Sequence, residues 1–170
     1  MVNSQVMDSQ KIKKIIINLS IVFLIFLIDR ISKIYILGIV ETQGQIDIYI
    51  NPFLNFVLIW NKGVGFGLFS FDHSQVYNFI TTLIVIINII IIYIIYKTKG
   101  YKIYFYSMIL GGALGNLFDR LYYSAVPDFI DFHINNFHWF IFNIADIFIS
   151  LGVVCLILVE IVFKNKPKNG

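Results

Sequence analysis

Charge is scarce in this chain. Of its 170 residues only 14% are Asp, Glu, Lys or Arg, whereas 58% are hydrophobic; soluble domains carry about 25% charge. The composition therefore excludes an ordinary soluble domain and predicts a membrane protein. The net charge of +3 indicates no nucleic-acid partner, because the basic residues flank apolar segments. Cysteine is equally scarce, and the single Cys155 excludes an intramolecular disulfide.

Several catalytic signatures are missing from the sequence as well. It contains no Ser with a matched His, no His-Glu-x-x-His and no Gly-rich phosphate loop between a strand and a helix. His133 and His138 lie near acidic residues but have no His-x-x-x-His or Cys spacing around them, so we expect no metal site. The catalytic groups that remain abundant are carboxylates.

Long apolar runs dominate what the chain does contain. A hydrocarbon core of about 30 Å is crossed by roughly 20 helical residues, and four segments reach that length. These segments lack the period-two alternation of a membrane barrel. We therefore predict a single domain, residues 1–170, that is an all-α integral membrane protein with four transmembrane helices. The predicted helices cover about residues 12–40, 74–97, 102–122 and 140–163.

Lysines flank these helices on one side. Nine of the 13 basic residues precede the first helix, connect the second to the third, or follow the fourth. By the positive-inside rule both termini are cytoplasmic, and the loops at about 41–73 and 123–139 lie outside. Residues 45–50 and 55–60 alternate apolar with polar side chains, which predicts a small extracytoplasmic β-sheet between helices one and two.

Aspartates from three different helices converge at one depth. Counted from the cytoplasmic lysines, Asp29, Asp119 and Asp146 lie 15, 17 and 18 residues into their helices. At about 1.5 Å per residue this places them roughly 22 to 27 Å above the inner boundary, near the outer surface. Asp128 and Asp131 follow in the second outer loop, just above that level. Ionisable groups inside a bilayer are costly and mark function by default.

Paired aspartates have a defined chemistry. Two carboxyl groups within hydrogen-bonding reach cannot both ionise readily in a low-dielectric site, so one keeps its proton near neutral pH. Such a pair can activate a water as general base and protonate a carbonyl oxygen as general acid, which is the chemistry of an aspartic peptidase. Spacing alone leaves open which two of the five aspartates form the pair.

Several of these polar residues also have purely structural interpretations. Asp29 with Lys33, and Asp119 with Arg120, could be ion pairs at the edge of the bilayer. Asn143 could simply cap the fourth helix.

Small residues accompany the polar ones on the third helix. Gly111 and Gly115 form a small-xxx-small pair that allows close helix approach. Gly112 and Asn116 share a neighbouring face, since they are four residues apart. A polar cavity between helices, open outward, is the arrangement that would satisfy these groups.

Five blocks of residues follow one another in a characteristic order. They are DRISK at 29–33, NKGVGFG at 61–67, GGALGNLFDR at 111–120, VPDFID at 126–131 and FNIAD at 142–146. On a four-helix frame these blocks resemble the lipoprotein signal peptidase family, also called signal peptidase II or prolipoprotein signal peptidase. The resemblance extends over about residues 21–159.

The resemblance implies an activity and a set of site residues. Asp128 and Asp146 would be catalytic, in an endopeptidase of the cytoplasmic (inner) membrane that cleaves diacylglyceryl-modified prolipoproteins before the lipidated cysteine. Its partners would be this substrate and membrane lipids, the enzyme would be a monomer without cofactor or metal, and globomycin would inhibit it. Binding or structural support is implied for the polar residues and one glycine of the same blocks, namely Asp29, Lys33, Asn61, Gly63, Asn116, Asp119, Arg120 and Asn143.

Two other classes of function use the same residues. A small transporter or proton-relay protein would carry ions along the buried Asp and Arg cluster. The charges lie at one end of the span, however, which leaves about 20 Å of inner helix without ionisable groups. A metal-dependent membrane hydrolase would instead use Asp and Asn side chains with His133 or His138.

Overall fold

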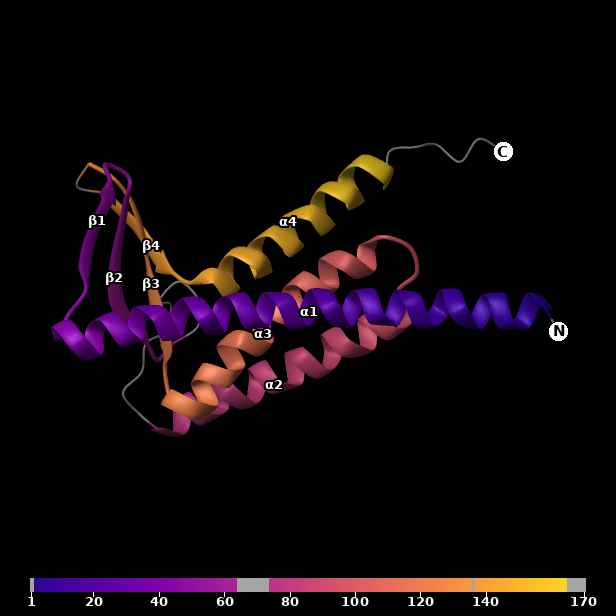
Figure 1. Cartoon of the computed structure of the whole chain (residues 1–170), viewed down its shortest axis with the longest axis horizontal. Helices are drawn as coiled ribbons and strands as arrows, with labels where there is room; N and C mark the ends of the chain where they lie inside the picture. The colour runs from indigo at the N-terminus through magenta and orange to yellow at the C-terminus, as the bar shows by residue number, and fades with distance from the viewer. Residues whose placement is uncertain (1, 64–73, 136, 165–170) are drawn as a thin grey trace.

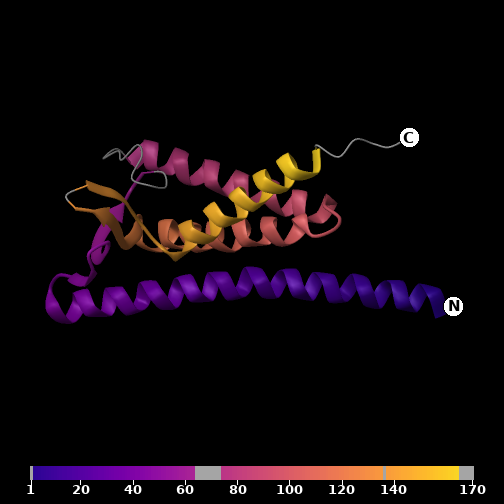
Figure 2. The same ribbon diagram turned by 90° about the horizontal axis from the view of Figure 1, so that it is seen from above.

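Four helices and four strands make up the computed structural model, which describes residues 2–63, 74–135 and 137–164. The helices form a bundle, and the strands form one antiparallel sheet at one end of it (Figure 1). Helix α1 runs along one side of the other three helices (Figure 2). The elements in chain order are α1 (Val2–Gln43), β1 (Asp47–Asn51), β2 (Leu54–Asn61), α2 (Ser74–Lys97), α3 (Lys102–Tyr123), β3 (Val126–Ile134), β4 (Phe137–Phe142) and α4 (Ile144–Lys164).

The sheet joins two segments that are far apart in the chain. Strands β1 and β2 form a hairpin after α1, where alternation in the sequence predicts strands. Strands β3 and β4 form a second hairpin between α3 and α4, and β2 pairs with β3 to give the order β1-β2-β3-β4. The predicted sheet between helices one and two is therefore only half of the sheet. Because β2 pairs with β3, Asn61 lies opposite Val126, and Ile59 lies opposite Asp128.

The start of the fourth helix differs from the prediction. Helix α4 begins at Ile144 rather than near residue 140, and much of the predicted outer loop at 123–139 is strand. The reason is the run Phe137–Phe142, whose sequence FHWFIF is almost entirely bulky and apolar. Such a short run has no periodicity that separates a strand from the first turn of an apolar helix.

Glycines bring α3 close to both α1 and α4. A Cβ atom added to Gly111 would lie 2.9 Å from Ile25 Cβ on α1, and one added to Gly112 would lie 2.5 Å from the Ala145 carbonyl oxygen on α4. Neither distance leaves room for a side chain, so the helix axes approach as small-xxx-small packing predicts. The polar side chains one turn further along α3 thereby reach both neighbouring helices.

Helix α3 is the helix without a membrane-span candidate among the described residues. Among the described residues, three helical segments are long and apolar enough to cross a membrane: Ile12–Gln43, Gln75–Lys97 and Ile144–Val162. Helix α3 is not one of them, yet it packs against α1, α2 and α4. The chain is thus a mostly helical, multi-pass membrane protein in which α3 packs against the other three helices.

Candidate active site

Four charged side chains of α1 and α3 form a buried ion cluster. Lys33 Nζ lies 2.9 Å from Asp29 Oδ2 and 2.6 Å from Asp119 Oδ2. Arg30 contacts the same two acids, with Nη2 3.1 Å from Asp29 Oδ2 and Nη1 2.5 Å from Asp119 Oδ1. The side chains of Lys33, Asp29 and Asp119 are inaccessible to solvent. Since two cations face two anions, each charge is compensated, which such burial requires.

Asn116 connects this ion cluster to Asp146. Lys33 Nζ donates to Asn116 Oδ1 at 2.9 Å, and Asn116 Nδ2 donates to Asp146 Oδ1 at 2.8 Å. A lysine ammonium is only a donor, so it fixes which end of the amide faces it. The Asn116 NH₂ group must then face Asp146. The ion cluster therefore orients a hydrogen-bond donor toward that carboxylate.

Asn143 holds two aspartates at once. Its Oδ1 accepts from the Asp146 backbone N–H at 3.1 Å, while its own backbone N–H donates to Asp146 Oδ2 at 3.2 Å. This reciprocal pair is a capping box at the start of α4. Asn143 Nδ2 also donates to Asp128 Oδ1 at 2.6 Å. A single, fully buried residue thus bridges Asp128 on β3 and Asp146 on α4.

The pKa of Asp128 is shifted strongly upward. It is only 2% exposed, and Asn61 Nδ2 donates to its Oδ2 at 2.9 Å. Burial, together with the nearby negative charge of Asp146, raises the pKa of Asp128 to about 7, although the amide donors of Asn61 and Asn143 favour the ionised form. Near neutral pH Asp128 therefore exists in both protonation states.

Arg120 points to a different side of α3 from Asp119 and holds the segment after β2. Its Nη2 donates to the Gly63 carbonyl oxygen, and the Gly63 N–H donates to Asn61 Oδ1 at 2.9 Å. Tyr77 on α2 donates its hydroxyl to the Arg120 carbonyl oxygen at 2.7 Å. Within the described part of the chain, the buried Nε and Nη1 of Arg120 have no hydrogen-bond partner. Two donor nitrogens of this guanidinium group are thus without a partner among the described residues.

An apolar pocket borders Asp146. Its volume is about 270 Å³, and apart from Asp146 and Ser150 it is lined by the hydrophobic residues Phe142, Ile147 and Leu151. The pocket places a hydrophobic surface directly beside one carboxylate.

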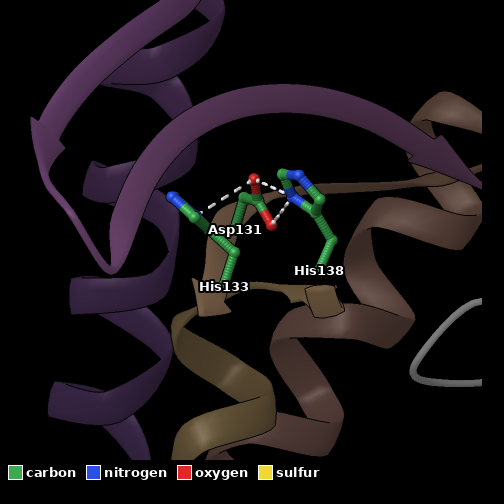
Figure 3. Close-up of side chains that lie close together, drawn as sticks. All are labelled: Asp131, His133 and His138. Atoms are coloured by element: carbon green, nitrogen blue, oxygen red, sulfur yellow. Dashed lines mark hydrogen bonds and ion pairs between the residues drawn. The ribbon is translucent and has the colours of Figure 1, made fainter. Parts of the chain in front are cut away.

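Asp131, the fifth candidate aspartate, belongs to a different cluster. Its Oδ2 lies 2.8 Å from His138 Nδ1 and 3.7 Å from His133 Nδ1. Figure 3 shows the carboxylate between the two imidazole rings. Asp128 and Asp131 are three residues apart on β3, and successive strand residues point to opposite faces of a sheet, so they project from opposite faces. The structure therefore groups Asp131 with the histidines and Asp128 with Asp146.

Residues 21–163 match the family model described as signal peptidase (SPase) II. The chain belongs to the signal peptidase II family. It is 53% identical over 163 residues to a lipoprotein signal peptidase of Pelagibacter ubique, covering 96% of this chain and 98% of that one. Over 150 residues it is 39% identical to a lipoprotein signal peptidase of Anaplasma phagocytophilum, covering 88% and 94%.

Two solved bacterial membrane enzymes share the fold. One, determined at 2.3 Å resolution, has a TM-score of 0.76 and 28% identity, covering 90% of this chain and 92% of that one. The other, at 1.9 Å, has a TM-score of 0.68 and 30% identity, covering 88% and 94%. The resemblance that the five sequence blocks indicate is thus confirmed at the level of the signal peptidase II family.

The structural interpretations of the polar residues have mixed outcomes in this signal peptidase II member. The Asp29–Lys33 pair is present, and Asn143 caps α4. The proposed pairing of Asp119 with Arg120 is wrong. Adjacent helical residues diverge by about 100°, so Asp119 faces α1 while Arg120 faces Gly63.

Two residues that contribute to the candidate site of this chain were not predicted from the sequence. Arg30 closes the ion cluster, and its only signal was its place beside Asp29 in the first block. Tyr77 contacts the backbone of Arg120 from α2, and nothing in its neighbourhood in the sequence indicates this role. The second block also extends to residues 64–67, which lie outside the described residues.

Proposed function

We propose that the protein is an intramembrane aspartic endopeptidase that removes the signal peptide from diacylglyceryl-modified prolipoproteins, cleaving before the lipidated cysteine. The observation that carries this proposal is the bridge made by Asn143, which donates hydrogen bonds to both Asp128 and Asp146. Two aspartates brought together at the junction of a strand and a helix can supply both the general acid and the general base for hydrolysis of an amide.

The raised pKa of Asp128 supports different roles for the two aspartates, one as general acid and the other as general base. With its pKa raised to about 7, Asp128 can hold a proton near neutral pH. The ionised carboxylate then takes a proton from the attacking water, and the protonated one donates to the carbonyl oxygen of the scissile bond. The roles exchange as protons move, because a coupled pair titrates as a unit.

Neighbouring residues act as positioning groups in this proposal. Asn61 and Asn116 each donate to one of the two carboxylates, at 2.9 Å and 2.8 Å. Arg120 has two buried donors without a partner among the described residues, which suits it to bind carbonyl oxygens of a peptide. Asp29, Lys33 and Asp119 act indirectly: they form the ion cluster, and Lys33 of this cluster fixes the side chain of Asn116.

The pocket beside Asp146 fits a substrate that arrives through the lipid. Its hydrophobic lining would accept an apolar side chain or part of an acyl chain without displacing a polar partner. We propose the orientation that the lysines predict, with both termini cytoplasmic, four spanning helices and the site near the outer face of the bacterial inner membrane. We also propose that the enzyme acts as a monomer.

Cleavage of a lipidated prolipoprotein by purified Asp128→Asn and Asp146→Asn variants tests the proposal. General acid-base groups contribute about 10²- to 10⁴-fold each, so both variants should lose turnover by at least this much. Asp47→Asn is the matched control, because Asp47 is an exposed aspartate on the same sheet. Thermal unfolding in detergent establishes that each variant is folded. Near-normal turnover in either folded dyad variant would refute the assignment.

A further inference from the structure

The cluster of Asp131, His133 and His138 lies apart from the two proposed catalytic aspartates and has the composition of a metal site. We propose that these three side chains bind a divalent transition-metal ion, with Zn²⁺ as the ion whose ligand preferences they match. Two imidazoles and one carboxylate with an open fourth position are a recurrent zinc donor set.

The sheet register brings the three donors together. His133 and His138 are Cα partners across β3 and β4, so their side chains lie on the same face of the hairpin. Asp131 precedes His133 by two residues on β3 and therefore shares that face. One possible ligand atom from each residue lies within 4.8 Å of the others. This convergence depends on strand pairing, which the helical His-x-x-x-His spacing does not describe.

The distances within the cluster are close to those of a coordinated ion. Nitrogen and oxygen ligands about 2.0–2.2 Å from zinc in a tetrahedron are roughly 3.3 Å from each other. Asp131 Oδ2 is 2.8 Å from His138 Nδ1 and 3.7 Å from His133 Nδ1. The two observed separations bracket the required one, and since the three ligand atoms lie within 4.8 Å of one another, the side chains would have to draw together around a bound ion.

Two buried polar atoms near the cluster have no hydrogen-bond partner among the described residues. His133 is only 8% exposed, and its Nδ1 is buried without a hydrogen-bond partner in the described structure. Asn55, the Cα partner of Asp131 on β2, likewise has a buried Oδ1 without a partner. Buried polar atoms are normally satisfied. A bound cation would engage the lone pair of His133 Nδ1 and add positive charge beside the Asp131 carboxylate.

The position of His138 makes the site accessible. Its side chain is 57% exposed, in contrast to 4% for Asp131, so an ion can enter from solvent and keep a water as its fourth ligand. A bound ion would tie β3 to β4 across the face opposite Asp128. Its role would therefore be to brace the hairpin that connects Asp128 to Asn143, rather than to take part in hydrolysis.

Zinc binding by the purified full-length chain tests this inference directly. The protein is prepared in detergent through a tag that contains no histidine, stripped with a chelator, and titrated with ZnCl₂ by calorimetry. We expect one Zn²⁺ per chain. His138→Gln and Asp131→Asn should each weaken binding at least ~10- to 100-fold, the loss that outer-shell changes alone can cause. Asp47→Asn, which changes an exposed aspartate of β1, should bind zinc like the wild type.

A second measurement separates loss of the site from loss of the fold. Zinc should raise the melting temperature of the wild type but not that of His138→Gln, which should fold normally because its side chain is exposed. Absence of saturable binding to the wild type, or equal affinity in wild type and His138→Gln, overturns the inference. Neither assay involves a peptide substrate, so the outcome is independent of the proposed peptidase activity.

Discussion

Replacing Lys33 by methionine should reveal how strongly the ion cluster stabilises the helix bundle. Methionine keeps an unbranched apolar stem but removes the ammonium that contacts Asp29 at 2.9 Å and Asp119 at 2.6 Å. In the variant, Arg30 alone would face both buried acids, leaving one negative charge uncompensated. Removing one partner of a buried ion pair costs about 3–5 kcal/mol. Because Arg30 still contacts both acids, we expect the lower end, about 3 kcal/mol.

Unfolding of the purified protein in mixed micelles, followed by circular dichroism as denaturing detergent is added, measures this loss. Lys99→Met is the control, because Lys99 is exposed between α2 and α3 and such a surface change should stay within about 0.5 kcal/mol. The double variant Lys33→Met/Asp119→Asn restores a one-to-one charge balance, so it should be more stable than Lys33→Met alone. A single variant as stable as the wild type, or a double variant less stable than the single one, would contradict the charge-balance argument.

Three further predictions concern helix packing and the proposed dyad. Gly112→Ala should destabilise the protein by about 1–3 kcal/mol, because its Cβ would lie 2.5 Å from the Ala145 carbonyl oxygen; Gly38→Ala, with nothing within 4 Å, should be neutral or stabilising in the same unfolding assay. Cleavage rate should fall as pH rises through about 7, where Asp128 loses its proton, and a flat pH profile there would contradict this. Asn143→Ala should lower turnover about 10²-fold or more. It should also cost about 1 kcal/mol for the lost cap and about 1–3 kcal/mol for the buried hydrogen bond to Asp128. A loss of stability without a loss of turnover would assign Asn143 a structural role alone.

Strand content was predictable only where the sequence alternates. Residues 45–50 and 55–60 alternate polar with apolar side chains, and the hairpin of β1 and β2 follows. The second hairpin was hidden because both faces of β3 are largely buried and β4 is almost uniformly bulky, so neither strand shows a clear period of two. Asn143 was the available signal for the correct start of α4, since a helix begins directly after its capping residue.

The depth of the site residues in the membrane was predictable from the sequence, but which residues contact one another was not. Counting residues from the cytoplasmic lysines places Asp29, Asp119 and Asp146 at one level, and hydrogen bonds through Lys33 and Asn116 do link them. Counting residues along a helix gives the depth of a side chain in the membrane but not the direction in which it points. The partners of each aspartate depend on that direction, because they are set by the face of the helix that its side chain occupies. For the same reason counting could not assign the outer-loop acids, which strand alternation separates onto two faces of the sheet.

The polarity of α3 has a consequence for how the chain is assembled. This helix lacks the apolarity of the three span candidates, and the partners of Asn116 and Asp119 lie on α1 and α4. Entering lipid alone, α3 would expose those groups to hydrocarbon, which is costly. Stable integration of α3 therefore has to be coupled to its neighbours: α1 must already be in the membrane to neutralise Asp119, and α4 supplies the partner of Asn116. Because α4 is synthesised after α3, the proposed active site can form only once α4 has joined the bundle.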